Sequence, residues 1–529
     1  MKKSLIILIT LFYNFCFSQN YDVSIYQEIA EDKSGFNAII DSEDWLGYSV
    51  ESIGDLNGDG TEDVAVGALK DDDGGFNKGA LYILFLNKDG TVNSHQKISD
   101  TEYRIYLTGY TEGGFEGILD DWDIFGSSIS YLGDINNDGF PDIGVGAEYD
   151  GDGGYWHGAV WILSLNSNGT VDSYSKISDT EGNFLAPLGD EDVFGTDISL
   201  LGDLDGDGFD DIAVSARRDP DGGSDRGAVY ILFLNKNLTV KNYQKISQSQ
   251  GDFQGQLDAG DYFGGAVANI GDIDLDRVVD IAVGAYRDDD GGSNRGALYI
   301  LFLNPDGSVK DYQKISSLLG GFETPFNEEM FFGASIDLAG DINENGLTEI
   351  IVGAKGYRNE EGLETGAFYI LDLNSNGTVN SFVRYTEGEQ LFDGDIIPES
   401  SFGFSVSYNK GLSTDDAIVS GSYTTDYIGG NENGSLWVLQ LGEILSIDNM
   451  DDNNVEVVVF PNPTKKSFKL NDIDGINLIQ IFDNQGKEII SYKDITSNNF
   501  DVSYLPVGTY LILIKNDNRN TFSYKLIKN

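Results

Sequence analysis

Cysteine and histidine are almost absent from this chain of 529 residues. The single cysteine, Cys16, lies in a segment that we expect to be cleaved off, so disulfide bonds cannot stabilise the mature protein. The two histidines are His95, in a predicted outer strand, and His157, in a predicted loop beside Trp156. Because a Gly-x-Ser-x-Gly nucleophile motif is missing as well, we predict that the protein is not an enzyme. His157 is the residue to test as a general base.

Positive charge is scarce too. The chain has 33 Lys and Arg against 88 Asp and Glu, a formal net charge of −55. Residues 455–529 are close to neutral, with nine Lys and Arg against eight Asp and Glu, so the excess negative charge precedes them. An acidic surface repels nucleic acid and anionic membranes. We therefore expect no nucleic-acid partner, and we expect cations to balance the carboxylates.

Long apolar runs are also missing. No run reaches the roughly 20 residues that a membrane-spanning helix needs, so we predict no spanning segment. The N-terminus has a charged start (Met1–Lys3), an apolar stretch (Leu5–Phe12) and a short final part (Cys16–Ser18). These are the three parts of a secretory signal peptide, which we place over residues 1–18.

What the sequence does contain is a segment of about 69 residues that occurs six times. The copies begin at Leu46-Gly47, Phe125-Gly126, Phe194-Gly195, Phe263-Gly264, Phe332-Gly333 and Phe402-Gly403. Successive glycines are 79, 69, 69, 69 and 70 residues apart, so the first copy carries a ten-residue insertion, which lies within residues 101–122. A fixed period of this length indicates a repeat architecture.

Each copy contains four short β-forming runs separated by turn residues, which predicts a four-stranded antiparallel sheet. The third runs, such as Ala297–Leu303, are apolar on both faces and must be covered on both sides. The sixth copy ends after its third run, whereas a spare fourth run lies near the N-terminus at Tyr26–Ala30. Pairing these ends predicts an all-β fold, a six-bladed β-propeller over residues 21–441 whose N-terminal strand closes the last blade. We expect a monomer.

The turn between the first and second runs carries oxygen-bearing side chains at loop positions 1, 3, 5 and 9. Including position 7, the residues in copies one to three are Asp55, Asn57, Asp59, Thr61 and Asp63; Asp134, Asn136, Asp138, Phe140 and Asp142; and Asp203, Asp205, Asp207, Phe209 and Asp211. With glycine at position 6 and a backbone carbonyl from position 7, this spacing suits a hard cation that takes six to eight oxygen ligands. Position 12 is valine and not the glutamate of an EF-hand, so we predict three calcium loops in β-hairpins.

Copies four and five keep part of this pattern. Their residues are Asp272, Asp274, Asp276 and Asp280, and Asp341, Asn343, Asn345 and Glu349. We predict weaker calcium sites in both. Arg277 replaces the glycine of copy four and loses the easy left-handed turn, and copy five carries less charge. The sixth copy has lost the pattern. We expect the ions to hold the hairpins together rather than to contact a ligand.

The Phe-Gly start, the aspartate loop and a following Gly-Ala pair together resemble the FG-GAP repeats of the integrin α-subunit propeller. The Gly-Ala pairs are Gly67-Ala68, Gly146-Ala147, Gly284-Ala285 and Gly353-Ala354. The chain departs from integrins in having six copies instead of seven, no proline after Gly-Ala, and no leg domains or membrane helix after the repeats. The resemblance implies the propeller fold and the calcium sites, with adhesion as an analogy.

Loops between the second and third runs should lie on the face opposite the calcium loops, because successive strands alternate in direction. These loops are acidic: Asp71–Gly75, Asp150–Gly154, Asp219–Gly223 and Asp288–Gly292. The connections between copies share that face and carry Phe115, Phe184, Phe253, Phe322 and, in the insertion, Tyr103, Tyr106, Tyr110 and Trp122. Aromatic residues among carboxylates are typical of a carbohydrate- or protein-binding surface, but aromatics that pack loops onto blade ends give the same pattern.

The chain ends in a segment of different composition. Residues 442–454 are polar and predict a linker, and residues 455–529 contain short alternating strands that predict a small β-sandwich. The elements Phe460–Pro463, Asp483–Lys487, Leu505–Tyr510 and Lys525–Lys528 resemble the type A C-terminal sorting domain of the type IX secretion system. The resemblance implies export across the outer membrane of a Bacteroidetes bacterium by that machinery, removal of the tail, and release or anchoring at the surface. An ordinary adhesive sandwich is the alternative.

Two functions remain open at this point. The first is a secreted or cell-surface calcium-binding propeller that acts as an adhesion or ligand-binding module for an unknown protein or glycan. The second is a calcium-dependent polysaccharide lyase or hydrolase on the same scaffold. Abundant carboxylates in an acidic repeat do not place a pair at catalytic distance, so we favour the binding module.

Overall fold

The computed structural model describes residues 22–100, 115, 117–322, 327–359, 361–392, 394–412, 416–425 and 433–442, and in the C-terminal segment 459–460, 464–470, 476–482, 487–493, 495, 497–506, 508–516 and 521–528. The predicted signal peptide, most of the insertion after residue 100 and the predicted linker after residue 442 lie outside the described residues. Within them, no helix is long and apolar enough to cross a membrane.

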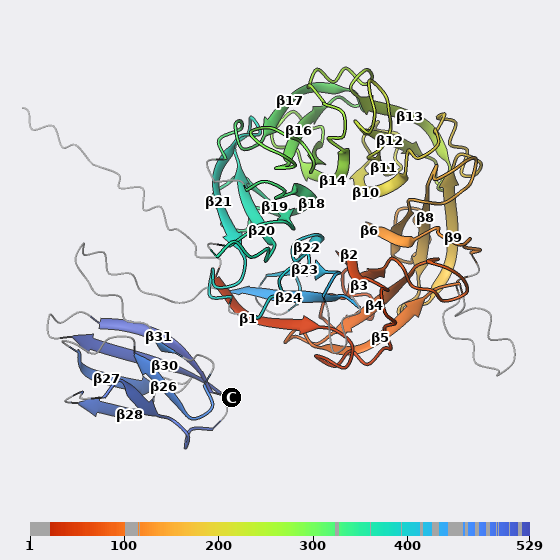
Figure 1. Cartoon of the computed structure of the whole chain (residues 1–529). Helices are drawn as coiled ribbons and strands as arrows, with labels where there is room; N and C mark the ends of the chain where they lie inside the picture. The colour runs from red at the N-terminus through yellow and green to blue at the C-terminus, as the bar shows by residue number, and fades with distance from the viewer. Residues whose placement is uncertain are drawn as a thin grey trace, which may run out of the picture. The chain divides into compact units, whose positions relative to one another are not determined.

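Residues 23–442 form one compact unit, in which six four-stranded sheets surround a central axis (Figure 1). The strands of blades 1 to 5 follow the order of the sequence from the axis outwards. Blade 1 is β2 (Leu46–Ser52), β3 (Val64–Ala68), β4 (Ala80–Leu86) and β5 (Val92–Ile98). Blade 2 is β6 (Phe125–Gly133), β7 (Asp142–Ala147), β8 (Ala159–Leu165) and β9 (Val171–Ser178). Blade 3 is β10 (Phe194–Gly202), β11 (Asp211–Ala216), β12 (Ala228–Leu234) and β13 (Val240–Ser247). Blade 4 is β14 (Phe263–Gly271), β15 (Asp280–Ala285), β16 (Ala297–Leu303) and β17 (Val309–Ile315). Blade 5 is β18 (Phe332–Gly340), β19 (Thr348–Ala354), β20 (Ala367–Leu373) and β21 (Val379–Tyr385).

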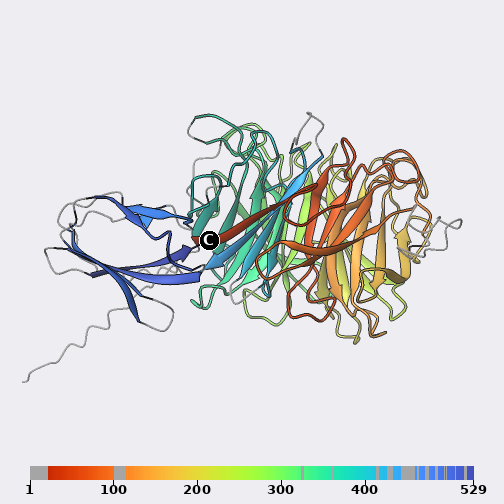
Figure 2. The same cartoon turned by 90° about the horizontal axis from the view of Figure 1, so that it is seen from below.

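The sixth blade is built from both ends of the repeat region. It contains β22 (Val406–Asn409), β23 (Ala417–Ser422), β24 (Ser435–Gly442) and the N-terminal strand β1 (Asp22–Ile29), in the order β1-β24-β23-β22. Figures 1 and 2 show β1, in red, beside the light-blue β24. Ile29 is buried in a core shared by blades 6 and 1, and the Tyr26 ring contacts Phe392 and Trp437. The predicted six-bladed propeller, closed by the N-terminal strand, is confirmed.

The third strand of each of the first five blades is buried along its whole length, as its apolar sequence predicts. Alternate side chains of β12 face the two neighbouring blades. Ile231 packs with Tyr299 of blade 4, and Tyr230 packs with Ile162 of blade 2. The hydrophobic core therefore consists of the interfaces between blades. Each fully buried aliphatic side chain in it contributes about 1.5–3 kcal/mol to stability.

The glycine of each Phe-Gly pair is required where one blade meets the next. Gly195 has a φ of 88°, which favours glycine, and a Cβ atom there would lie 2.3 Å from the Ala159 carbonyl oxygen of blade 2. A larger residue would therefore push two blades apart.

The innermost strands surround a cavity of about 270 Å³. Their inner edges have no strand neighbour, so their N–H groups need other acceptors. Side chains of the preceding blade provide acceptors to β2, β6, β14 and β22. The acceptor and donor pairs are Glu51 and Tyr131 (2.9 Å), Asp197 and Val267 (2.7 Å), Ser199 and Asn269 (2.9 Å), Asp337 and Tyr408 (2.7 Å), and Ser407 and Ser52 (3.0 Å). Burial raises the pKa of Asp197 to about 7 and that of Asp337 to about 6.

The C-terminal unit contains two small antiparallel sheets, β25-β26-β29 and β28-β27-β30-β31. Its strands are β25 (Val459–Phe460), β26 (Ser467–Leu470), β27 (Ile476–Phe482), β28 (Glu488–Lys493), β29 (Asn499–Asp501), β30 (Gly508–Asn516) and β31 (Thr521–Lys528). Both sheets share one apolar core that includes Phe468, Ile479 and Ile512. Short strands are present in this segment, as the sequence predicted.

Candidate metal sites

The loops between the first and second strands of blades 1 to 5 share one backbone conformation. The residue pairs at loop positions 4 and 6 all have positive φ: Gly58 and Gly60, Asn137 and Gly139, Gly206 and Gly208, Leu275 and Arg277, and Glu344 and Gly346. In all five loops the N–H at position 6 donates to the aspartate at position 1, at 2.8–3.0 Å. Arg277 adopts this conformation at φ 77°, so the fourth loop keeps the turn that its missing glycine put in doubt.

The carboxylate at position 9 is fully buried at the start of the second strand in Asp63, Asp142, Asp211 and Asp280. Each accepts the backbone N–H of position 2 at 3.0–3.1 Å. Burial disfavours the charged form and raises the pKa of Asp63 and Asp280 to about 7 and that of Asp142 and Asp211 to about 6. Glu349 occupies this position in blade 5, where burial raises its pKa to about 7. A bound cation would favour the charged form of these groups.

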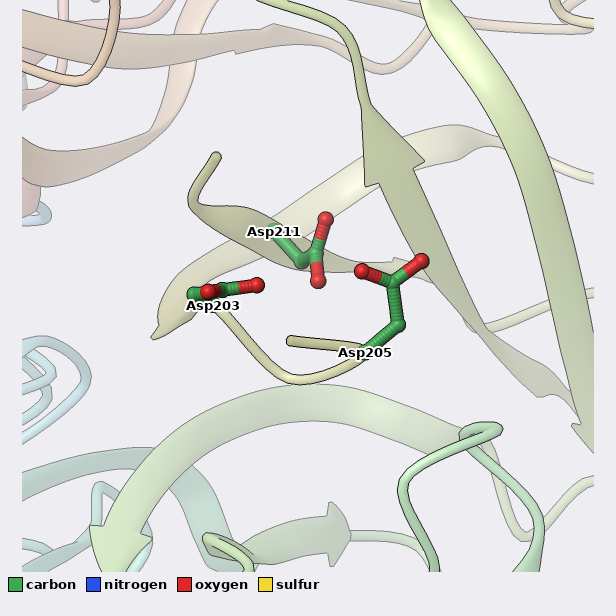
Figure 3. Close-up of side chains that lie close together, drawn as sticks. All are labelled: Asp203, Asp205 and Asp211. Carbon is green, nitrogen blue, oxygen red and sulfur yellow. The ribbon is translucent and has the colours of Figure 1, made fainter. Parts of the chain in front are cut away.

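Carboxylates converge in blades 3 and 4. Two groups each bring three carboxylate oxygens within 4.8 Å of one another: Asp203, Asp205 and Asp211, and Asp272, Asp274 and Asp276. Figure 3 shows the first group, with its three side chains around the bend of the loop. This crowding of oxygens suits calcium, whose bonds to oxygen are about 2.3–2.6 Å long. Across the part of the chain that the structure describes, no other three Asp, Glu, His or Cys side chains meet this spacing.

The same two loops have a lysine neighbour that the sequence interpretation missed. Lys241 Nζ lies 2.6 Å from Asp205 Oδ2, and Lys310 Nζ lies 2.6 Å from Asp274 Oδ2. Each ammonium also contacts the aspartate at position 5 of its loop. Both lysines occupy the second position of a fourth strand, more than 30 residues after the loop, so only an alignment of the copies could have connected them.

In blades 1 and 2 an asparagine, and not a lysine, contacts the aspartate at position 5 of the loop. Position 3 is Asn57 or Asn136, and each side-chain amide donates to the position-5 aspartate, at 3.0 Å and 2.9 Å. The additional carboxylate at position 3 of blades 3 and 4 therefore comes with an additional ammonium group. In each of these four loops, a positive charge or an amide group balances the outer carboxylate.

Blade 5 uses its side-chain amides within the fold. Asn343 donates to Glu349, and Asn345 donates to Asp372 of the third strand at 3.1 Å. Asp341 and Glu349 are the carboxylates at positions 1, 3, 5 and 9 of this loop, so these positions offer a cation less charge than those of the other loops. In blade 6, residues 413–415 of the corresponding turn lie outside the described residues.

On the opposite face, lysines of the fourth strands hold the acidic loops. The ion pairs are Lys97 with Asp71 and Asp73 (both 2.6 Å), Lys176 with Asp150 (2.7 Å) and Asp152 (2.8 Å), Lys245 with Asp219 (2.8 Å), and Lys314 with Asp288 (2.7 Å) and Asp290 (2.8 Å). Much of the negative charge expected on this face is therefore neutralised inside the fold.

Four of the five described aromatics that the sequence analysis placed on that face are core residues. Phe115, Phe184, Phe253 and Phe322 are buried, and each contacts the phenylalanine of the next Phe-Gly pair at 4.8–5.3 Å between ring centroids. For these four, the interpretation as loop packing is correct. Trp122 is different, because half of its side chain is exposed. Tyr103, Tyr106 and Tyr110 lie outside the described residues.

The two histidines have distinct environments. His95 packs against Phe36, with 5.2 Å between ring centroids, in an apolar setting that lowers its pKa by burial. His157 lies between Asp179 and Asp190, at 3.5 Å from its Nδ1 and 3.4 Å from its Nε2.

Comparison with known families supports both resemblances drawn from the sequence. Residues 194–232 and 256–302 match FG-GAP repeat families, and residues 458–529 match the secretion system C-terminal sorting domain family. The sorting domain indicates secretion or a cell-surface location.

The curated relatives match part of the propeller. The chain is 36% identical over 174 residues to integrin alpha-PS5 of Drosophila melanogaster, which is 33% of this chain and 15% of that protein. It is 30% identical over 219 residues to the phosphatidylinositol-glycan-specific phospholipase D of Rattus norvegicus, which is 40% of this chain and 23% of that enzyme. The chain thus spans less than a quarter of either protein. A solved extracellular domain of a hybrid two component system from B. thetaiotaomicron aligns with 95% of this chain and 57% of its own, with 13% identity and a TM-score of 0.34. The chain carries FG-GAP repeats similar to those of integrin alpha subunits, followed by a secretion system C-terminal sorting domain.

Proposed function

We propose that the protein is an exported, calcium-stabilised propeller that acts as a binding or adhesion module and not as an enzyme. The convergence of three carboxylates in each of blades 3 and 4 carries the calcium part of this proposal. Three like charges at such short range repel one another, and a divalent cation would remove that repulsion. Loops 1, 2 and 5 would bind calcium with the same backbone but with fewer carboxylates. Affinity in the range of about 10⁻⁴–10⁻³ M is expected for such an extracellular module.

The rigidity of the propeller and of its loops supports the binding role. Buried cores lie at five blade interfaces among the described residues, and ion pairs hold the loops of one face. A rigid disc with variable loops presents a surface without paying the entropy of ordering it on binding. His157, the one candidate general base, has a carboxylate beside each ring nitrogen, an arrangement that suits a structural role.

Calcium binding is tested by thermal unfolding and calorimetric titration of the secreted chain. Calcium should raise the melting temperature, chelator should lower it, and protease should cut faster within residues 55–63, 134–142 and 203–211 once the ion is removed. Asp203→Asn with Asp211→Asn should reduce the number of sites bound. The exposed Asp311 of β17 provides the matched control, and Asp311→Asn should change nothing. An unchanged melting temperature in excess chelator would remove the calcium proposal.

Export is proposed to follow the type IX route of a Bacteroidetes bacterium, with the tail removed and the propeller released or anchored at the surface. The sorting-domain match over residues 458–529 supports this route. The partners would then be the secretion machinery and an unknown protein or glycan.

A further inference from the structure

A group of exposed aromatic side chains lies on the loops of blades 1 and 2, opposite the calcium loops. Phe76, in the β3–β4 loop, is 64% exposed, and Trp122, in the connection from β5 to β6, is 52% exposed. Tyr155, in the β7–β8 loop, is 55% exposed, and the half-buried Trp156 follows it. We call these four residues the aromatic face.

Backbone and ring contacts fix the rings of the aromatic face. The Trp122 N–H donates to the Phe76 carbonyl at 2.8 Å, and the two rings are nearly parallel, 5° apart in orientation with centroids 6.4 Å apart. Tyr155 stacks on Trp156 at 4.4 Å, and Trp156 stacks on Tyr149 at 4.3 Å. The rings are therefore ordered before any ligand arrives, which reduces the entropy lost on binding.

Both tryptophans adopt a backbone conformation that is unfavourable for their residue type. Trp122 has a φ of 75° and Trp156 a φ of 55°, in the left-handed region that bulky residues avoid. At the position of Trp122 the other copies have Glu43, Glu191, Gly260, Glu329 and Glu399. At the position of Trp156 copies one, three and four have Asn77, Asp225 and Asn294, the residue types that tolerate this conformation best. A strained, exposed tryptophan in one copy of a repeat points to a function of that copy.

The positions of Phe76 and Tyr155 show the same contrast. Copies three and four have Ser224 and Ser293 there, with the same hydrogen bond to the following connection. The small polar residue is therefore sufficient for the fold. The aromatic residues are confined to blades 1 and 2, so the face is a local addition to the propeller.

One carboxylate is bonded to the backbone of each exposed loop aromatic. Asp121 Oδ1 accepts the Phe76 N–H at 3.1 Å, and Asp190 Oδ1 accepts the Tyr155 N–H at 3.0 Å. The second oxygen of each carboxylate can accept a further hydrogen bond. The cores of protein–protein interfaces are depleted of such charged groups. A sugar is chemically complementary to the aromatic face. Its C–H surface packs on aromatic rings, and its hydroxyl groups donate hydrogen bonds to carboxylates. The net charge of −55 disfavours an anionic polymer.

We propose that the aromatic face of blades 1 and 2 binds a neutral polysaccharide. This inference rests on the proposed binding function and names its ligand class. The calcium loops take no part in the contact, because they lie at the other ends of the strands.

The test replaces each aromatic residue by the residue of a sister copy, so that the fold is retained. The variants are Phe76→Ser with Trp122→Glu, and Tyr155→Ser with Trp156→Asn. Leu363→Ser is the matched control, since Leu363 is a 45% exposed apolar residue on the β19–β20 loop of blade 5. Binding of the secreted chain, in calcium, is measured against neutral polysaccharides (cellulose, chitin, mannan, xylan) and anionic ones (alginate, polygalacturonate) by affinity electrophoresis and pull-down.

We expect wild type and Leu363→Ser to bind at least one neutral polymer, and each double variant to bind it at least about tenfold more weakly. The melting temperature of both double variants should be unchanged or higher, because Asn tolerates the left-handed conformation better than Trp and because Glu already adopts it at the equivalent position of four other copies. Three results would overturn the proposal: binding to no neutral polymer, equal binding by the double variants, or an effect of these variants on self-association or protein binding alone. If chelator still lowers the melting temperature in those cases, the calcium-stabilised propeller stands and only the ligand assignment fails.

Discussion

Closure of the ring by β1 can be tested with two isoleucines of the same strand. Ile29 has no exposed surface and belongs to the core shared by blades 6 and 1, whereas Ile25 is 37% exposed. Replacement of a fully buried isoleucine by alanine removes three methyl or methylene groups and leaves a cavity, at a cost of about 2–5 kcal/mol. Ile25→Ala should cost less than about 1 kcal/mol.

Ile246→Ala separates closure from ordinary core packing. Ile246 is the equivalent residue of blade 3, equally buried, but its strand is covalently continuous with the blades on both sides. It should lower the free energy of unfolding as much as Ile29→Ala does. Only Ile29→Ala or deletion of residues 21–30 should detach β1 and expose the edge of β24. This strand is almost entirely buried in the intact protein. An apolar edge of this kind pairs with other chains, so we expect oligomers from these two variants alone.

Urea unfolding followed by fluorescence, with light scattering after size exclusion, provides the assay. Trp437 of β24 is a local reporter, because its ring is 6.1 Å from that of Tyr26 and 5.3 Å from that of Phe392. Its environment should change in the deletion variant before global unfolding. A monomeric deletion variant with the unfolding free energy of the intact chain would refute closure by β1.

Three further outcomes are expected. Lys241→Met and Lys310→Met should each tighten calcium binding to one site about five- to tenfold in titration calorimetry, because an ammonium no longer competes for the loop carboxylates. The control Lys236→Met, on an exposed turn, should leave the affinity unchanged. Equal affinities in all three variants and the wild type would mean that the two lysines do not affect the sites. Asp197→Asn should stabilise the calcium-free protein at pH 8 and not at pH 5. The folded-state pKa of Asp197, about 7, exceeds its unfolded value, so the stability of the wild type falls by up to about 1.4 kcal/mol per pH unit as pH rises towards 7. A stability difference between variant and wild type that does not change with pH would contradict this expectation. Removal of residues 455–529 from the gene should retain the propeller in the periplasm, as measured by cell fractionation, while its melting temperature in calcium stays the same; appearance of the shortened chain in the medium would show that the tail is not the export signal.

The repeat pattern was sufficient to predict the fold because each feature of a blade has a local sequence signal. A third strand that is apolar on both faces must be covered by a neighbouring blade on each side. The additional β-forming run at Tyr26–Ala30 corresponds to the strand that the last copy lacks. The aspartate loops were predictable for the same reason, since their ligand-type residues lie within nine positions of one another.

Long-range pairing and backbone strain were not predictable in this way. The contact between Lys241 and Asp205 joins residues 36 positions apart in the sequence and depends on how the fourth strand passes the loop. The doubt about copy four arose from Arg277, whose left-handed conformation the surrounding loop imposes. Trp122 was noted as an aromatic residue, but its positive φ is visible only in the structure.

The hydrogen bonds around the central cavity have a consequence for how this protein can change over time. Each of these bonds joins a side chain of one blade to the backbone of the next, and the pair Ser407 and Ser52 joins the last blade to the first. A blade inserted between them would separate this pair, and the Ser52 N–H would then depend on an acceptor from the inserted blade. A chain with seven blades would need a new acceptor at the junction as well as a new blade. Copy number is therefore coupled to a few side chains at the axis, because gain or loss of a repeat at one of these junctions changes which side chain meets which N–H group.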